Sequence, residues 1–262
     1  MKKPLILIVF LTIFTNSSVY SATGDVLSSF SAPSAGTTGV TFDGTYLWTI
    51  DTLNREFVQL TKTGTKITSF SIPAEIVSPV DLTYDGSFLW VTDKTSDKIF
   101  QLSTVGLVLS FFLCPCTQPL GLAFDGTYFL VGSEPDEIVQ VTTSGTLVKS
   151  MVSPVRVPQG LTYANDLIWI SGLITDNIHA TTIYGGLSVY SFPEPDANTQ
   201  GLGFDGISLW AAGSITDKIY ELELNPIMII PVLSHFELTI LLIVFGLLLG
   251  IYSQLKVLSK VH

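Results

Sequence analysis

Acidic side chains recur in one kind of segment along this 262-residue chain. Each segment is polar and follows a short apolar stretch, and the carboxylates that these segments hold are Asp51, Asp93, Asp97, Asp136, Asp176 and Asp217. If folding brought the segments together, the carboxylates would form a ring of oxygen ligands, the donors that Ca²⁺ prefers. The same carboxylates could instead accept hydrogen bonds from the backbone of their own turns and stay solvated. The residue types alone leave both interpretations open.

A second group with chemical potential is the cysteine pair Cys114 and Cys116, which a single proline separates. In an oxidising compartment the pair could form a disulfide that closes a very small loop. Redox or copper chemistry is one alternative, and an incidental pair in a surface loop is another. The chain has only three histidines, and His179 alone precedes residue 226. A His-rich zinc site and a Ser/His/Asp triad are therefore not expected, whereas acid–base catalysis by carboxylates remains open.

The net charge of the chain limits the classes of molecule that it is expected to bind. With 12 Lys+Arg against 22 Asp+Glu, the formal net charge is −10. All 22 acidic residues but only eight of the basic ones lie within residues 22–237, whose net charge is therefore −14. Such a segment favours cations or cationic partners, and it disfavours nucleic acid, which requires a basic surface.

Five segments of the chain share one sequence pattern, and the structure that they form must position the acidic residues and the cysteine pair. They begin at Gly39, Asp81, Gly121, Gly160 and Gly201. Their anchor aromatic residues, spaced by 42, 40, 39 and 41 positions, are Phe42, Tyr84, Phe124, Tyr163 and Phe204. Each repeat reads as four short strands, and in four repeats an Asp-Gly pair after the first strand suggests a tight hairpin with positive φ angles. A period near 40 with several strands per repeat predicts the blades of an all-β propeller.

The ends of the repeat region indicate how the ring closes. The fourth strand of a repeat ends in Ser-Phe-x-x-Pro or a variant, and an extra copy at residues 29–33 precedes the first repeat. The fifth repeat stops after its third strand, at residues 219–224. We therefore predict a five-bladed propeller of four-stranded antiparallel blades over residues 22–225, with the N-terminal strand closing the last blade. An unclosed ring would expose strand edges that favour aggregation.

Aromatic residues recur at one position of the second strand. Trp48, Trp90, Trp169 and Trp210 occupy it in four repeats, and Leu130 fills it in the third. The rings could form a platform for sugars. Because leucine substitutes for tryptophan, packing between blades is the favoured interpretation.

Both ends of the chain carry targeting signals. Lys2, Lys3 and the apolar run that follows them predict a signal peptide over residues 1–21, cut after Ser21. A retained anchor is the alternative, but the run is shorter than the roughly 20 residues that span a bilayer. Residues 238–255 hold no charge and predict one C-terminal transmembrane helix, followed by a short basic cytoplasmic tail, 256–262. The chain is thus expected to be exported and anchored in the membrane by a single span, with the propeller outside.

Two parts of the chain resemble known families. The repeat body, with phrases such as Asp-Leu-Thr-Tyr-Asp-Gly-Ser-Phe-Leu-Trp-Val-Thr-Asp from Asp81, resembles the NHL/YVTN-type β-propellers. That resemblance implies binding or scaffolding and, in some members, lyase or lactonase activity. The linker 226–237 contains Ile230, Pro231, Val232, Leu233 and Ser234, which resemble the IPTL-CTERM sorting signal of Gram-negative bacteria. Val232, His235 and Phe236 depart from that family's Ile-Pro-Thr-Leu-Ser-Glu-Trp, although the resemblance implies processing by an exosortase-type peptidase.

Two functions follow as expectations. The first is a binding or interaction module at the cell surface or in the periplasm, with a surface glycan or protein as ligand and no chemistry of its own. The second is a cation-dependent lyase or lactonase that uses carboxylates at the channel mouth, with Ca²⁺ as a candidate cofactor. Catalysis is the less favoured of the two, because no catalytic constellation is evident in the residues.

Overall fold

The computed structural model describes residues 23–224 of the chain. The predicted signal peptide, sorting-like linker, transmembrane helix and basic tail lie outside the described residues. Among those residues, no helix is long and apolar enough to cross a membrane.

The described residues form twenty strands in five separate four-stranded sheets. The first blade contains β2 (Thr37–Phe42), β3 (Leu47–Asp51), β4 (Glu56–Leu60) and β5 (Lys66–Ser71). The second contains β6 (Pro79–Tyr84), β7 (Leu89–Asp93), β8 (Lys98–Leu102) and β9 (Val108–Leu113). The third contains β10 (Pro119–Phe124), β11 (Phe129–Ser133), β12 (Glu137–Val141) and β13 (Leu147–Val152). The fourth contains β14 (Pro158–Ala164), β15 (Leu167–Gly172), β16 (Asn177–Thr181) and β17 (Tyr190–Pro193). The fifth contains β18 (Thr199–Phe204), β19 (Leu209–Gly213), β20 (Lys218–Leu222) and β1 (Val26–Ser31).

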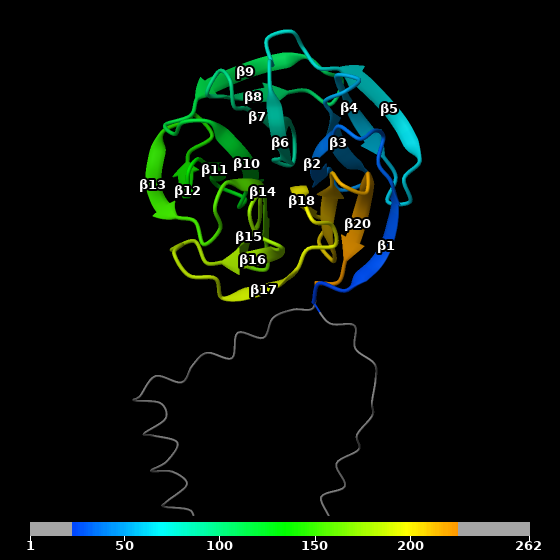
Figure 1. Ribbon diagram of the computed structural model, residues 1–262. Coiled ribbons are helices and arrows are strands. Elements are labelled where there is room, and N and C mark those ends of the chain that lie inside the picture. Colours follow the sequence, from blue (N-terminus) through cyan, green and yellow to red (C-terminus); the bar gives the residue numbers. More distant parts are fainter. Residues whose placement is uncertain (1–22, 225–262) are drawn as a thin grey trace, which may run out of the picture. The chain divides into compact units, whose positions relative to one another are not determined.

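The blades surround a central axis, as Figure 1 shows. The first strand of each blade lies innermost, and each inner strand contacts the inner strand of the next blade. All strand pairs within the blades are antiparallel. The predicted five-bladed all-β propeller is therefore confirmed for the described residues.

The N-terminal strand closes the ring as predicted. Strand β1 pairs with β20, with Phe30 opposite Ile219 and Ser31 opposite Lys218. The closure begins before the strand, because the backbone N–H of Gly24 donates to the carbonyl of Glu223 over 2.8 Å. Residues from the two ends of the described chain thus complete one blade.

Tryptophan side chains form part of the core between blades. Trp48, Trp169 and Trp210 are at most 1% exposed and Trp90 is 4% exposed, so they form no sugar platform. The indole N–H of Trp48 donates to Asp43 over 2.7 Å, and the equivalent bond joins Trp90 to Asp85. The packing interpretation of these residues is confirmed.

The Asp-Gly turns differ from the expected hairpins in their backbone angles. In the first blade Phe42 pairs with Leu47, and the backbone N–H of Asp43 donates to the Tyr46 carbonyl over 3.0 Å, so the turn itself is tight. Only Gly44 has a positive φ, 96°, while the Asp43 carboxylate accepts hydrogen bonds from the backbone N–H groups of Thr45 and Tyr46. The aspartate therefore stabilises the turn through its side chain and not through its backbone conformation.

The alternation of strand directions gives the propeller two unlike faces. One face carries the loops between second and third strands together with the connections between blades, and we call it the connection face. The opposite face carries the remaining turns, and we call it the turn face. Gly24 and Glu223 lie together at the turn face, where β20 ends and β1 begins.

Candidate functional site at the channel mouth

The six acidic residues singled out in the sequence all lie on the connection face. Asp51 and Asp93 end strands β3 and β7, and the other four stand immediately before the third strands of their blades. Among the described residues, no group of three or more His, Cys, Asp or Glu side chains is arranged to hold a metal ion. The six carboxylates are therefore spread around the face and do not converge.

Asp51 and Asp93 use their oxygens to order the loops that follow them. Asp51 accepts from the Ser34 hydroxyl over 2.6 Å and from the backbone N–H of Asn54 over 2.9 Å. Asp93 accepts from the backbone N–H groups of Val77 and Thr95 over 2.6 and 2.9 Å. Burial raises the pKa of Asp51, but the hydrogen bonds from Asn54 and Ser34 outweigh it and hold the pKa below 3.8. These carboxylates bind local N–H and O–H groups, the arrangement of a turn cap.

In the fifth blade, a carboxylate from the connection between blades takes the place of the aspartate at the end of the second strand. Gly213 stands where Asp51 and Asp93 stand in their blades, and the space of its missing side chain holds the carboxylate of Asp196. Asp196 comes from the connection between the fourth and fifth blades, and it accepts from the backbone N–H and the hydroxyl of Thr216. The alignment of the repeats could not reveal this exchange, because the replacing carboxylate lies outside the aligned strands.

The remaining acids have different local roles. Asp97 and Asp217 both have a φ of 54°, in the left-handed region, and each precedes the third strand of its blade. The Asp97 carboxylate also accepts from the backbone N–H of Gln118 over 2.8 Å. Asp136 faces Arg156 at 3.6 Å, and the carbonyl of Asp176 accepts from the backbone N–H of Glu194 over 3.0 Å.

A cavity of about 310 Å³ lies where the inner strands begin on the connection face, and we call it the mouth pocket. It is lined by Thr38, Thr52, Ser78, Pro79, Val80, Lys94, Leu120, Gln159 and Gln200. Five of these lining residues occupy one repeat position, just before the axis position of each blade. Hydroxyl and amide groups dominate the polar lining, and Lys94 is its single charged residue. The sequence reasoning missed this site because it examined the loops and not the first residues of the inner strands.

Two polar atoms of the mouth pocket are buried without a partner. The hydroxyl of Thr38 and the amide oxygen of Gln159 are inaccessible to water, yet neither has a hydrogen-bond partner among the described residues. A buried polar group without a partner costs free energy, on the order of 1–3 kcal/mol. A molecule in the mouth pocket would pair with these atoms once the Thr38 and Gln159 side chains turn toward the cavity, because water does not reach either atom in its present position.

Glu194 lies in the connection between the fourth and fifth blades, and its partner Thr199 directly precedes Gln200 of the mouth pocket. One of its oxygens accepts from the backbone N–H of Thr199 over 3.0 Å, and the other is buried without a partner. Burial raises the pKa of Glu194 to about 7, and the nearby Asp176 carboxylate adds to the rise. A carboxyl group that titrates near neutral pH can both take up and release a proton.

Below the mouth pocket, the axis is closed by a single side chain. Asp81 is fully buried, and its carboxylate accepts from the backbone N–H groups of Leu122 and Leu161 over 2.9 and 3.1 Å. The four other blades carry glycine at the equivalent position. The mouth pocket therefore has its opening on the connection face.

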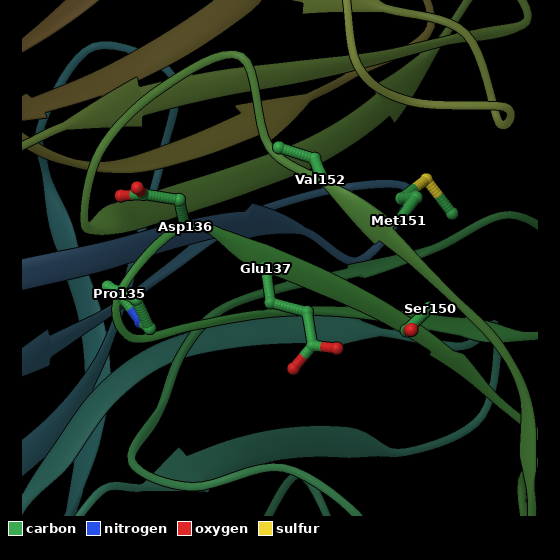
Figure 2. A pocket seen from close by; sticks show the side chains of 6 residues that line it. All are labelled: Pro135, Asp136, Glu137, Ser150, Met151 and Val152. Atoms are coloured by element: carbon green, nitrogen blue, oxygen red, sulfur yellow. The ribbon is translucent and has the colours of Figure 1, made fainter.

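A second hollow, of about 530 Å³, lies on the outer side of the third blade, away from the axis. Figure 2 shows its six lining residues. Three of them stand at or just before the start of β12, and three belong to β13. Met151 of this set also packs against Gly185 of the fourth blade. The wall is largely apolar, and the Glu137 carboxylate points away from the Met151 thioether in this view.

The cysteines lie in the connection between the second and third blades. Cys114 and Cys116 form a disulfide with a Cα–Cα distance of 5.0 Å. They are 8% and 9% exposed and belong to the apolar cluster that includes Trp90 and Phe129. The bond is therefore packed into the core between two blades.

Comparison with protein-family models gives no match, and neither does comparison with curated proteins. Solved structures do match. The glutaminyl cyclase of Myxococcus xanthus has a TM-score of 0.65 at 14% identity, over 77% of this chain and 96% of its own. The PQQ-bound aldose sugar dehydrogenase of Streptomyces coelicolor has a TM-score of 0.50 at 14% identity, over 76% and 97%. The virginiamycin B lyase of Staphylococcus aureus has a TM-score of 0.49 at 15% identity, over 76% and 99%. At such identities, the first two likenesses establish the β-propeller fold alone.

Proposed function

We propose that this protein is a binding module that holds a small polar part of its ligand in the mouth pocket. The observation that carries the proposal is the pair of buried polar atoms without partners, Thr38 Oγ1 and Gln159 Oε1. The Gln159 oxygen can only accept, so the ligand must offer an O–H or N–H group there. The Thr38 hydroxyl can donate or accept.

The composition of the pocket indicates the class of ligand. Its polar lining consists of hydroxyls, amides and one ammonium group, with no carboxylate and no imidazole. Groups of this kind bind by hydrogen bonding, and the hydroxyls are weak nucleophiles without a neighbouring base. A glycan terminus or an exposed peptide segment on a partner protein offers matching hydroxyl and amide groups.

Localisation completes the proposal. The signal peptide predicted over residues 1–21 and the apolar segment 238–255 support export and a single membrane anchor, with the propeller outside. The segment from Ile230 to Ser234 supports recognition by an exosortase-type peptidase, and the strongly acidic repeat region argues against nucleic acid as a partner. The module would then act at the cell surface or in the periplasm.

Glycan-array and titration-calorimetry measurements on the full-length chain test the binding proposal. Thr38→Val and Gln159→Ala should each weaken a captured ligand by about tenfold, which corresponds to one hydrogen bond. Thr127→Val is the matched control, because Thr127 is exposed on the turn face, at the opposite side of the propeller from the mouth pocket. Equal affinities for all three variants would place the ligand outside the mouth pocket.

A second function, an enzyme of the lyase or lactonase type, is favoured by Glu194. Its pKa, raised to about 7 chiefly by burial, suits a group that takes a proton from a substrate. Turnover of lactones and polysaccharides by the full-length chain, with and without Ca²⁺, tests this function. If the wild type turns over none of these substrates, the enzymatic function is refuted. If Glu194→Gln keeps the wild-type activity, Glu194 is not the base.

A further inference from the structure

We propose that the inner strands form an anion-binding ring on the propeller axis, and that Asp81 fills this ring as a built-in ligand. The ring would accept a small free carboxylate, of the size of formate, once the side chain of Asp81 is removed. This site is separate from the mouth pocket, and the proposal does not depend on what the mouth pocket binds.

The space around the axis has room for one side chain. A Cβ atom on Gly201 would lie 2.4 Å from the Gly39 Cα, and one on Gly160 would lie 2.8 Å from the Gly201 Cα. Both distances are shorter than side-chain carbons tolerate, so these backbones touch. The carboxylate of Asp81 occupies the remaining space, since a Cβ on Gly39 would lie 2.9 Å from its Oδ1.

The ring consists of backbone N–H groups from different blades. Oδ2 of Asp81 accepts from Leu122 and Leu161, and Oδ1 accepts from Leu82, over 2.9, 3.1 and 2.9 Å. These donors each follow the axis position of their blade. Each inner strand has an irregular register near this position, a β-bulge that re-aims the backbone.

Within residues 23–224, none of the ion pairs includes Asp81. The ion pairs of the described residues join Lys62 to Asp205, Lys66 to Glu56 and Arg156 to Asp136. The negative charge of Asp81 must therefore be stabilised by the N–H groups alone, as in backbone anion sites elsewhere. Burial raises the pKa of Asp81 well above its ordinary value, even though the hydrogen bonds from Leu122, Leu161 and Leu82 lower it, so the case for the charged form rests on the geometry of its partners. A protonated carboxyl would need an acceptor for its O–H, whereas Leu82, Leu122 and Leu161 all contact its two oxygens through donors.

The test compares Asp81→Gly with Asp81→Asn in the full-length protein. Thermal unfolding is measured in sodium formate and in sodium gluconate at equal ionic strength, because gluconate is too large for the vacated space. Asp81→Gly should be less stable than the wild type in gluconate and should recover in formate with saturation, by about 5–10 °C at a hundredfold excess over Kd. The wild type should show no difference between the two salts, since its ring is full.

Asp81→Asn separates an anion site from a merely filled space. The amide has the size of the carboxylate, but its NH₂ group would face N–H donors, so this variant should melt below the wild type and should ignore formate. Infrared difference spectra between wild type and Asp81→Asn should show an ionised carboxylate at pH 7.

Three results would overturn the proposal. They are an Asp81→Asn variant as stable as the wild type, a protonated carboxyl in the infrared spectrum, or an Asp81→Gly variant that responds equally to formate and gluconate. If Asp81→Gly does not fold in gluconate, refolding yield in the two salts replaces the melting temperature. Equal yields would then count against the anion ring.

Discussion

Closure of the ring by β1 predicts that Phe30 is as important to stability as its counterpart in a continuous blade. Phe30 packs against Gly64 of the next blade, with its ring centre 6.2 Å from that of Trp210. Phe70 of the first blade packs in the same way against Gly106, 5.6 Å from Trp48. Both rings are half-buried. The two positions differ chiefly in that Phe70 is joined by a short turn to its neighbouring strand, whereas Phe30 belongs to the far end of the chain.

The magnitude follows from the buried surface. Replacing a half-buried phenylalanine by alanine removes on the order of 100 Å² of buried apolar area, which stabilises the fold by about 2.5 kcal/mol. We therefore expect Phe30→Ala and Phe70→Ala each to lower the free energy of unfolding by about 2–3 kcal/mol. For a domain of this size, the melting temperature should fall by roughly 5–10 °C.

Urea unfolding of the full-length chain, followed by tryptophan fluorescence, measures both variants. All four tryptophans are buried, so their emission reports loss of the core. Leu27→Ala is the control within β1, because Leu27 is 45% exposed and should change stability by less than about 0.5 kcal/mol. A Phe30→Ala variant within about 0.5 kcal/mol of the wild type, beside a Phe70→Ala variant that loses 2 kcal/mol or more, would refute closure by β1.

Three further predictions concern single residues. In the folded state Glu194 keeps its proton up to about pH 7, whereas an unfolded glutamate releases it near pH 4.5. The free energy of unfolding of the wild type should therefore fall as pH rises between these values. The expected loss is about 1–2 kcal/mol, after allowing for solvent screening of this half-buried group. Glu194→Gln should remove that part of the slope in urea titrations, and an unchanged slope would contradict the assignment. Asp205→Ala should cost about 2–3 kcal/mol, because it leaves the buried indole N–H of Trp210 and the backbone N–H of Ser208 without their acceptor, and a smaller loss in calorimetry than about 0.5 kcal/mol would contradict this. Reduction of the Cys114–Cys116 bond, which closes only a three-residue loop, should lower stability by no more than about 1.5 kcal/mol, as melting with and without reductant would reveal.

The fold could be predicted from the sequence because each blade repeats the same order of strands and turns at a nearly constant spacing. The extra strand at residues 29–33 and the missing fourth strand of the last repeat together specified how the ring closes. Gly24 was not foreseen, although it has a reason in the same pattern. With a φ of 94° it packs against Phe192, as Gly64 packs against Phe30, so it takes the place of the turn glycine that the fifth blade lacks.

The candidate site was harder to predict, for two reasons. Residues of the mouth pocket, such as Gln159 and Gln200, stand one position before the aligned motif, and ordinary polar residues at strand starts attract no attention. Glu194 carries no signal in the sequence, because its raised pKa depends on burial between two blades. The acidic residues of the loops gave a visible pattern, but a pattern of carboxylates does not reveal whether their oxygens face a common centre or their own backbone.

Asp81 was visible in the alignment as the one acid in a column of glycines. Its meaning depended on distances, because glycine at that column marks close approach of backbones only once the strands are placed around an axis.

The described residues begin and end on the same face of the propeller, and this affects how a ligand could reach the mouth pocket. Gly24 and Glu223 meet at the turn face, and the mouth pocket opens on the connection face, at the opposite ends of the strands. At the level of Asp81 the inner strands touch, so the axis offers no passage from the turn face to the pocket. If the segment after residue 225 anchors the chain as proposed, the tether begins at the face opposite the opening of the mouth pocket. Under that proposal, a ligand as large as a glycan or a partner protein would reach the connection face without passing the point at which the described chain ends.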